Sequence, residues 1–197
     1  MQARVTRLGH VGIMVRDLDR SVEFYTRALG LQLTERFEYP ADEVGHGVTV
    51  AAGAFVRCGA DHHVLAIFQP REGLLPPDAP DGSQPGIGLH HLAFELSSPG
   101  ELLAKLREVR DAGVPIVNAR KGGPGNQPRF YVRDPDGNLV ELYWGIDQVG
   151  WDGLPRAYEP ITEIDLDAFD FDAYVAERDE AAARMRSAAT GAGAALP

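Results

Sequence analysis

Apolar and polar residues follow one another along the chain in patterns that predict short strands and two main helices. The segment 5–15 alternates like a strand, so His10 lies on the face opposite the apolar positions. Apolar positions then recur at helical spacing until Gly30, a residue that commonly ends a helix. Three strand-like segments follow, at 32–39, 47–57 and 63–69.

The same order of elements returns in the second half of the chain. Residues 90–96 predict a strand, and a helix opened by Pro99 ends at Gly113. An internal repeat is a stronger signal than any single propensity. We therefore expect an α+β fold of two repeated βαβββ modules, at about 5–70 and 87–145, whose mixed sheet curves around a metal-containing cavity. The last three strands are expected at 115–119, 129–133 and 139–144, the final two joined by the turn Asp134-Pro135-Asp136-Gly137.

Two further segments lie outside this repeat. Residues 70–86 hold five prolines among Gly and Asp, so we expect a linker without regular structure there. Residues 146–180 carry many large apolar side chains, so we expect this extension to pack on the body of the protein. The Ala- and Gly-rich segment 181–197 is expected to be a disordered tail.

Composition narrows the class of protein. The 197 residues include 29 acidic and 19 basic side chains, for a net charge of −10, and no basic patch. A partner with many phosphates, such as nucleic acid or an anionic membrane surface, is therefore not expected. The single cysteine, Cys58, excludes a disulfide within the chain and a cysteine zinc cluster. With no signal-peptide pattern at residue 1 either, we expect a cytoplasmic protein.

Three residues form a candidate metal site. His10 opens the first strand of the first module, His91 holds the equivalent place in the second, and Glu141 lies in the apolar strand that ends the second. A carboxylate in an apolar strand needs a cation or several donors. If the repeat is real, all three side chains can face one cavity. Two imidazoles and one carboxylate are the facial triad of Fe(II) oxygenases, and Mn(II) can also occupy it.

Three sequence segments resemble those of a known family. They are Leu8–Gly12, Gly88–Phe94 and Phe130–Glu141. On these segments the chain resembles the vicinal oxygen chelate superfamily of glyoxalases, bleomycin resistance proteins and dioxygenases. Within it the chain is most similar to a one-domain form of the type I extradiol dioxygenases. The resemblance implies Fe(II), or Mn(II), and an aromatic diol such as catechol or 2,3-dihydroxybiphenyl that is opened by O₂ in aromatic hydrocarbon catabolism. We also expect a homo-oligomer.

The resemblance also assigns residues around the metal. The family's ligands fall on His10, His91 and Glu141, its conserved tyrosine falls on Tyr131, and a catalytic histidine near the end of the first module falls on His62. The chain departs from the family at one position. A histidine usual about nine residues before the tyrosine would fall near Gly122, where this chain has none. Asn126 could supply a weaker hydrogen bond.

Two alternative functions share the same fold. A glyoxalase or epimerase of this superfamily usually takes a fourth metal ligand from the last strand of the first module, and repeat symmetry puts that position near Ala66, which cannot ligate. A metal-free binding module, like the bleomycin-sequestering proteins, would not need His10, His91 and Glu141 together. The ligand pattern therefore favours the dioxygenase.

Overall fold

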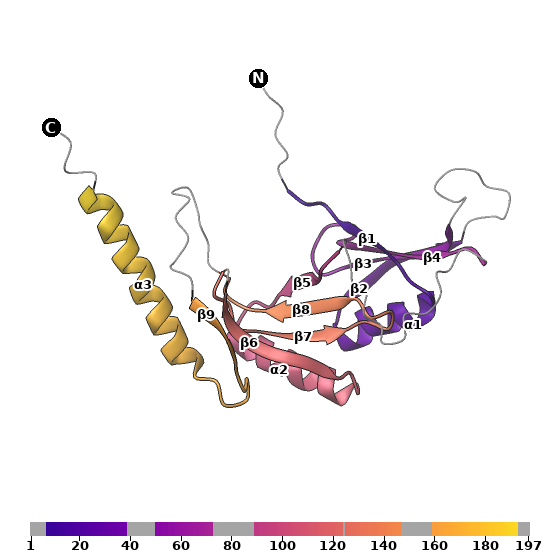
Figure 1. The fold of residues 1–197 in the computed structure, drawn as a ribbon. Helices are drawn as coiled ribbons and strands as arrows, with labels where there is room; N and C mark the ends of the chain where they lie inside the picture. The colour runs from indigo at the N-terminus through magenta and orange to yellow at the C-terminus, as the bar shows by residue number, and fades with distance from the viewer. Residues whose placement is uncertain (1–6, 39–49, 73–88, 124, 147–158, 193–197) are drawn as a thin grey trace, which may run out of the picture. The chain divides into compact units, whose positions relative to one another are not determined.

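The computed structural model describes residues 7–38, 50–72, 89–123, 125–146 and 159–192 (Figure 1). Its contacts divide the chain into two compact units. The first unit holds Met1–Leu92, Glu108–Pro115 and Arg133–Leu139, and the second holds Ala93–Arg107, Ile116–Val132 and Val140–Pro197. Most of the expected linker, from residue 73 onward, lies outside the described residues, and so do the first residues of the extension, 147–158.

Each module contains one strand, one helical segment and three further strands, as the repeat predicts. In the first module these are β1 (Val11–Met14), α1 (Leu18–Glu23) continued by the π-helix η1 (Phe24–Ala28), β2 (Gln32–Glu38), β3 (Val50–Arg57) and β4 (Leu65–Pro70). In the second they are β5 (Leu92–Glu95), α2 (Pro99–Asp111), β6 (Ile116–Gly123), β7 (Arg129–Arg133) and β8 (Leu139–Tyr143). The extension adds β9 (Glu159–Glu163) and α3 (Phe171–Ala192).

The order of strands confirms the repeat. The four-stranded sheet runs β1-β4-β3-β2, and the five-stranded sheet runs β5-β8-β7-β6-β9. Both modules therefore place their last strand next to their first, and β9 is an addition at the edge of the second sheet. The β1–β4 pair is parallel, whereas β3 is antiparallel to β2 and β4. The expected α+β class is confirmed, with its strands divided between two sheets.

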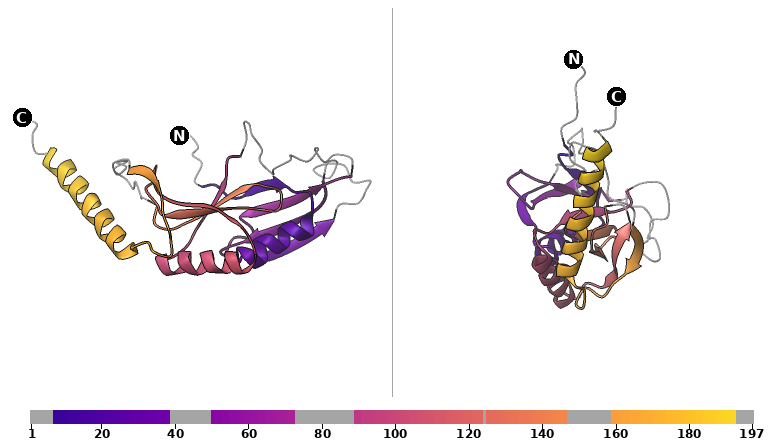
Figure 2. Two further views of the ribbon diagram at one scale, coloured as in Figure 1. Left: turned by 60° about the horizontal axis from the view of Figure 1, so that its bottom comes forward. Right: turned by 90° about the vertical axis from the view of Figure 1, so that its left-hand side faces the viewer.

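In the first unit, one face of the sheet holds the core. The α1 helix packs against β3 and β4 along this face (Figure 2). Strand alternation turns Ile13, Val56 and Ile67 into the core, where each is nearly fully buried. The opposite face carries Gly12 and Met14, the positions expected to share a face with His10, and Met14 is 50% exposed.

The second sheet is divided in the same way. Phe130 and Val132 of β7 are fully buried, as is Val140 of β8. Tyr131 lies between Phe130 and Val132, and Glu141 comes directly after Val140. Both therefore project from the other face. Each module thus leaves one sheet face for side chains that are not needed in the apolar core.

The turn Asp134-Pro135-Asp136-Gly137 is held by its first carboxylate. Asp134 accepts hydrogen bonds from the backbone amides of Asp136 and Asn138, at 3.0 and 2.8 Å. It also accepts one from the hydroxyl of Tyr25 at 2.8 Å. Burial, and then the neighbouring Asp134 carboxylate, raise the pKa of Tyr25 well above its usual range. The turn Asp134-Pro135-Asp136-Gly137 therefore stabilises the first unit.

The extension pairs with the second unit through its backbone. In register, β9 runs antiparallel to β6, with Lys121 opposite Thr162 and Gly123 opposite Glu159. The Tyr174 hydroxyl, in α3, donates a 2.8 Å hydrogen bond to the carbonyl of Asn126. The α3 helix continues to Ala192, although we expected an irregular chain from residue 181. Alanine has the highest helix propensity of all residues, which accounts for the regular backbone there.

Candidate metal centre and substrate face

His10 lies directly before β1 and is exposed. In the first unit the ring next to it is that of His63, with 4.4 Å between the ring centroids. His63 also stacks on Phe55 at 4.4 Å. Burial, and then the nearby His10 and His62, lower the pKa of His63.

His62, to which the resemblance assigns a catalytic role, points elsewhere. Its Nε2 lies 3.4 Å from the carboxylate of Glu35, and both side chains are more than half exposed. Its Nδ1 lies 3.0 Å from Nδ1 of His63. The structure therefore brings His63 against the ring of His10, and turns His62 toward Glu35.

An aromatic surface continues from His63 across the same sheet. The rings of Phe37, Phe55 and Phe68 lie 5.1 to 6.3 Å apart. Gly53 leaves room for them, since a Cβ atom there would lie 2.4 Å from the Phe37 ring. Faces and edges of aromatic rings attract other rings, so this surface suits a flat aromatic ligand.

Glu141 of β8 is the buried carboxylate of the second unit, and only 3% of the residue is exposed. The Tyr131 hydroxyl donates to its Oε2 at 2.6 Å, and Gln127 Nε2 donates to its Oε1 at 3.0 Å. Both carboxylate oxygens are thus hydrogen-bonded, as a buried charge requires.

Arg129 completes this network. Its Nε donates to the Tyr131 hydroxyl at 2.9 Å, and its Nη1 donates to the carbonyls of Gly122 and Gln127, both at 2.8 Å. Burial, followed by the Glu141 carboxylate, raises the pKa of Tyr131, while Arg129 opposes the shift. Arg129 thus fixes the tyrosine oxygen, and the tyrosine proton points to Glu141.

Three buried polar atoms in this unit have no hydrogen-bond partner among the described residues. They are Asn118 Oδ1, Arg120 Nε and Gln127 Oε1. Asn118 pairs with Tyr131 across the sheet, and Arg120 pairs with Arg129. Directly paired residues in antiparallel strands project from the same face. The orphaned atoms therefore surround the Glu141 network, and unsatisfied polar groups of this kind mark a place for a ligand, an ion or water.

The structure leaves no room for a histidine at Gly122. Gly122 has a φ of 81°, a conformation that favours glycine, and a Cβ atom there would lie 2.3 Å from the carbonyl oxygen of Pro160 in β9. Any side chain at this position would collide with the extension. Asn126, the substitute suggested by the sequence, is buried, and its Oδ1 accepts from the Glu159 amide. Arg129, which the sequence analysis did not single out, reaches the Tyr131 hydroxyl instead.

The three expected metal ligands are distributed over both units. His10 and His91 belong to the first, and Glu141 belongs to the second. His91 is half-buried, and its Nδ1 lies 2.6 Å from that of His90. Among the described residues, no three His, Cys, Asp or Glu side chains are grouped closely enough to hold a metal. The three-ligand centre stays a prediction, and its donor chemistry fits Fe(II) or Mn(II), because imidazole and carboxylate suit both.

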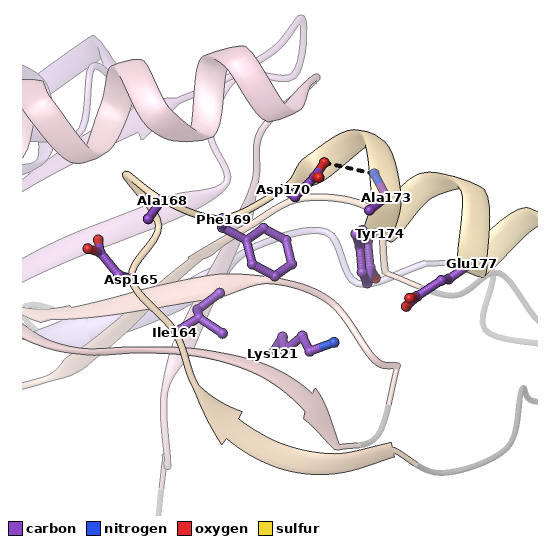
Figure 3. Close-up of a pocket in the computed structure, with 9 residues that line it drawn as sticks. All are labelled: Lys121, Ile164, Asp165, Ala168, Phe169, Asp170, Ala173, Tyr174 and Glu177. Carbon is purple, nitrogen blue, oxygen red and sulfur yellow. Dashed lines mark hydrogen bonds between the residues drawn. The ribbon is translucent and has the colours of Figure 1, made fainter.

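The extension contributes a separate cavity of about 380 Å³ (Figure 3). Figure 3 shows Phe169 and Tyr174 on one side of it and Lys121 of β6 across from them. Asp170 accepts a hydrogen bond from the Ala173 amide, which caps α3. Residues of the extension and of β6 together line this cavity.

Comparison with known proteins identifies the class. The chain belongs to the glyoxalase/bleomycin resistance protein/dioxygenase superfamily, whose family model matches residues 7–142. It is 32% identical over 137 residues to biphenyl-2,3-diol 1,2-dioxygenase 3 of Rhodococcus globerulus, which covers 69% of this chain and 62% of that protein. It is 30% identical over 136 residues to a probable lactoylglutathione lyase of Synechocystis, covering 68% of this chain and 91% of the relative.

A solved structure shows the same fold. It is the glyoxylase/bleomycin resistance protein/dioxygenase domain from Frankia, with a TM-score of 0.54 and 25% identity, covering 72% of this chain and 99% of that one. The chain spans only 62%, 42% and 41% of the lengths of three dioxygenase relatives. Across the described ranges, no helix is long and apolar enough to cross a membrane.

Proposed function

We propose that the protein is an extradiol dioxygenase, which opens the ring of an aromatic diol with O₂. Fe(II), or Mn(II), would be held by His10, His91 and Glu141. The observation that carries the proposal is the buried Glu141 carboxylate, whose oxygens are oriented by Tyr131 and Gln127. A carboxylate prepared in this way on a sheet face is what a metal ligand requires. The dioxygenase relative from Rhodococcus supports the choice of reaction.

Bound Fe(II) would supply the redox chemistry that lets O₂ react with the diol. The protein's own residues bind and orient the substrate. Within the first unit, the aromatic surface of Phe37, Phe55 and Phe68 suits a flat ring. His63 would accept a proton from a diol hydroxyl, since its ring, rather than that of His62, faces His10. The reaction balances without another reductant, because one ring C–C bond beside a hydroxyl breaks and both atoms of O₂ enter the product.

Tyr131 would position the diol by hydrogen bonding. Its hydroxyl accepts from Arg129 and donates its single proton to Oε2 of Glu141, so a diol oxygen bound beside Glu141 would take this proton in place of Oε2. The carbonyls of Gly122 and Gln127 hold the Arg129 guanidinium in place. This arrangement keeps the tyrosine proton directed at the metal site.

A glyoxalase or epimerase is the second candidate, and the Synechocystis relative favours it. Such enzymes of this superfamily usually take a fourth metal ligand from the strand equivalent to β4. Ala66 and Phe68 occupy the corresponding face of β4, where they pair with Gly12 and Met14 of β1. Neither side chain can bind a metal, so these two residues do not supply the fourth protein ligand of such enzymes, and this favours the dioxygenase.

Anaerobic reconstitution with Fe(II), followed by a panel of aromatic diols, tests the proposal. O₂ uptake and the absorbance of a ring-opened product are the readouts. We expect one or more diols to be opened. Loaded protein that consumes no O₂ with any diol, but isomerises a hemithioacetal or a thioester, would establish the second candidate instead.

A further inference from the structure

We propose that the substrate carries a carboxylate beside its diol and that Arg129 binds this carboxylate; the inference rests on the proposed function and names the substrate class. Arg129 is 6% exposed, although an arginine is almost never buried without a partner for its charge. The hydrogen bonds that it makes with described residues go to neutral oxygens: one tyrosine hydroxyl and two carbonyls. Its other terminal nitrogen, Nη2, makes none within these ranges.

The charge next to Arg129 supports an anionic ligand. Glu141 is the nearest carboxylate in the network, and Tyr131 stands between it and the guanidinium. A metal cation bound to Glu141 would use that negative charge, so the partners left to Arg129 among the described residues would all be neutral: three hydrogen-bonded oxygens and the Tyr131 ring, 5.9 Å from its guanidinium carbon. A buried charge of this kind is costly unless an anion accompanies it. A planar guanidinium whose Nη2 makes no hydrogen bond with the described residues matches the geometry of a carboxylate.

The orphaned atoms supply the remaining contacts. Arg120 Nε is a second unpartnered donor on the same sheet face, opposite Arg129 in register. The Arg120 guanidinium meets Glu163 only at 3.7 Å, through Nη2. Asn118 Oδ1 and Gln127 Oε1 are acceptors without a partner among the described residues, and they suit a hydroxyl or a water beside the carboxylate. This part of the second unit therefore presents two guanidinium groups and two unpartnered acceptors.

The position of Arg129 indicates which ring carbon of the substrate carries the carboxylate. Only the Tyr131 hydroxyl separates the guanidinium from the Glu141 carboxylate. If the diol binds at Glu141 and is held by Tyr131, a substituent on the adjacent ring carbon is the one that can reach Arg129. The proposed class is thus a 2,3-dihydroxybenzoate-type acid rather than a diol with an apolar substituent at that position.

Two matched ligands test the inference: 2,3-dihydroxybenzoate and its neutral amide, 2,3-dihydroxybenzamide. Their dissociation constants are measured with Fe(II)-loaded protein under anaerobic conditions by calorimetry, and metal content is measured in the same samples. A hydrogen bond to a charged group contributes about 1.5–3 kcal/mol, so we expect the acid to bind roughly tenfold to 100-fold more tightly. Equal affinities would overturn the inference.

Arginine variants show whether Arg129 causes the preference. Arg129→Gln should abolish it with metal content unchanged, and Arg120→Gln, a second variant in case the first does not fold, should reduce it. Arg107→Gln, which removes a charge from an exposed position of α2, should keep it in full. A preference that survives in both Arg129→Gln and Arg120→Gln would contradict the assignment.

Turnover then separates this inference from the proposed function. Ring opening of acid and amide with the same kcat/KM would overturn the inference and support the function. Tight, Arg129-dependent binding of the acid without any O₂ uptake would support the anion site and overturn the function.

Discussion

The hydroxyl of Tyr131 donates a hydrogen bond to Oε2 of Glu141 at 2.6 Å. This hydrogen bond joins Glu141, the metal ligand that we propose in the second unit, to Tyr131, the residue that we propose to orient the diol. In Tyr131→Phe the ring stays, and the hydroxyl loses both this bond and the one that it accepts from Arg129 Nε. We expect full metal content and a kcat reduced about tenfold to 100-fold, less than the roughly 10²–10⁴-fold effect of a group that transfers a proton. An unchanged kcat would remove Tyr131 from the site.

Two neighbouring histidines allow a matched comparison. His63→Ala should retain the metal and lose about 10²–10⁴-fold in kcat, because the side chain that faces His10 is removed. His62→Ala removes an exposed contact with Glu35 and the 3.0 Å contact with Nδ1 of His63, but leaves the ring that faces His10, so it should stay close to the wild-type rate. Steady-state rates with the same diol, corrected for metal content, make the comparison. A larger loss of kcat in His62→Ala than in His63→Ala would show that His62, and not His63, is the base.

Metal content tests the ligands themselves. The purified protein should bind about one Fe(II) or Mn(II) per chain. His10→Ala, His91→Ala and Glu141→Ala should each abolish or strongly weaken binding, as measured by atomic absorption after dialysis. His90→Ala serves as the control beside His91 and should keep the metal. Full occupancy in the His91→Ala variant would refute the assignment.

Gly122 gives a prediction about stability. Gly122→Ala should lower the free energy of unfolding by about 1–3 kcal/mol, since an alanine Cβ would enter the space of the Pro160 carbonyl and a left-handed backbone is strained for alanine. Gly122→His should be no better, and restoring the family's histidine there should not raise turnover. Gly59→Ala, at a glycine with open space around it, is the control and should be nearly neutral. Thermal unfolding of the two alanine variants decides the point, and equal midpoints would contradict the close approach of β9.

The extension should stabilise the second unit. Tyr174→Phe removes a buried hydrogen bond to the Asn126 carbonyl and should cost about 0.5–1.5 kcal/mol in the free energy of unfolding. Glu177→Gln, at an exposed position one turn along α3, should have little effect. Truncation after Gly145 should lower the melting temperature further, because β9 and α3 are lost together. A truncated protein with the wild-type melting temperature would show that the extension packs on nothing.

Much of the fold could be predicted because the sequence repeats. Alternation predicts that the strand after His10 has one apolar face, and in the structure Ile13 of β1 is buried whereas Gly12 and Met14 lie on the other face. β9 could not be foreseen in the same way. Its sequence, Glu-Pro-Ile-Thr-Glu, has no apolar alternation, since its pairing with β6 depends on backbone hydrogen bonds.

Parts of the candidate site depended on contacts that no pattern reports. The histidine pair at 62 and 63 precedes β4, so strand alternation does not decide which ring turns to His10. Arg129 opens a strand and would ordinarily be read as a surface residue. Its guanidinium is held by the carbonyls of Gly122, near the end of β6, and of Gln127, which follows β6 in the chain.

Isotope labelling of the product is the most direct test of the central claim. Fe(II)-loaded protein is mixed anaerobically with the diol that it turns over best, exposed to ¹⁸O₂, and the product is analysed by mass spectrometry. An extradiol dioxygenase should give one ring-opened product that contains both labelled oxygen atoms at the earliest reaction times. An unlabelled product, or an isomerised substrate formed without O₂, would contradict this function.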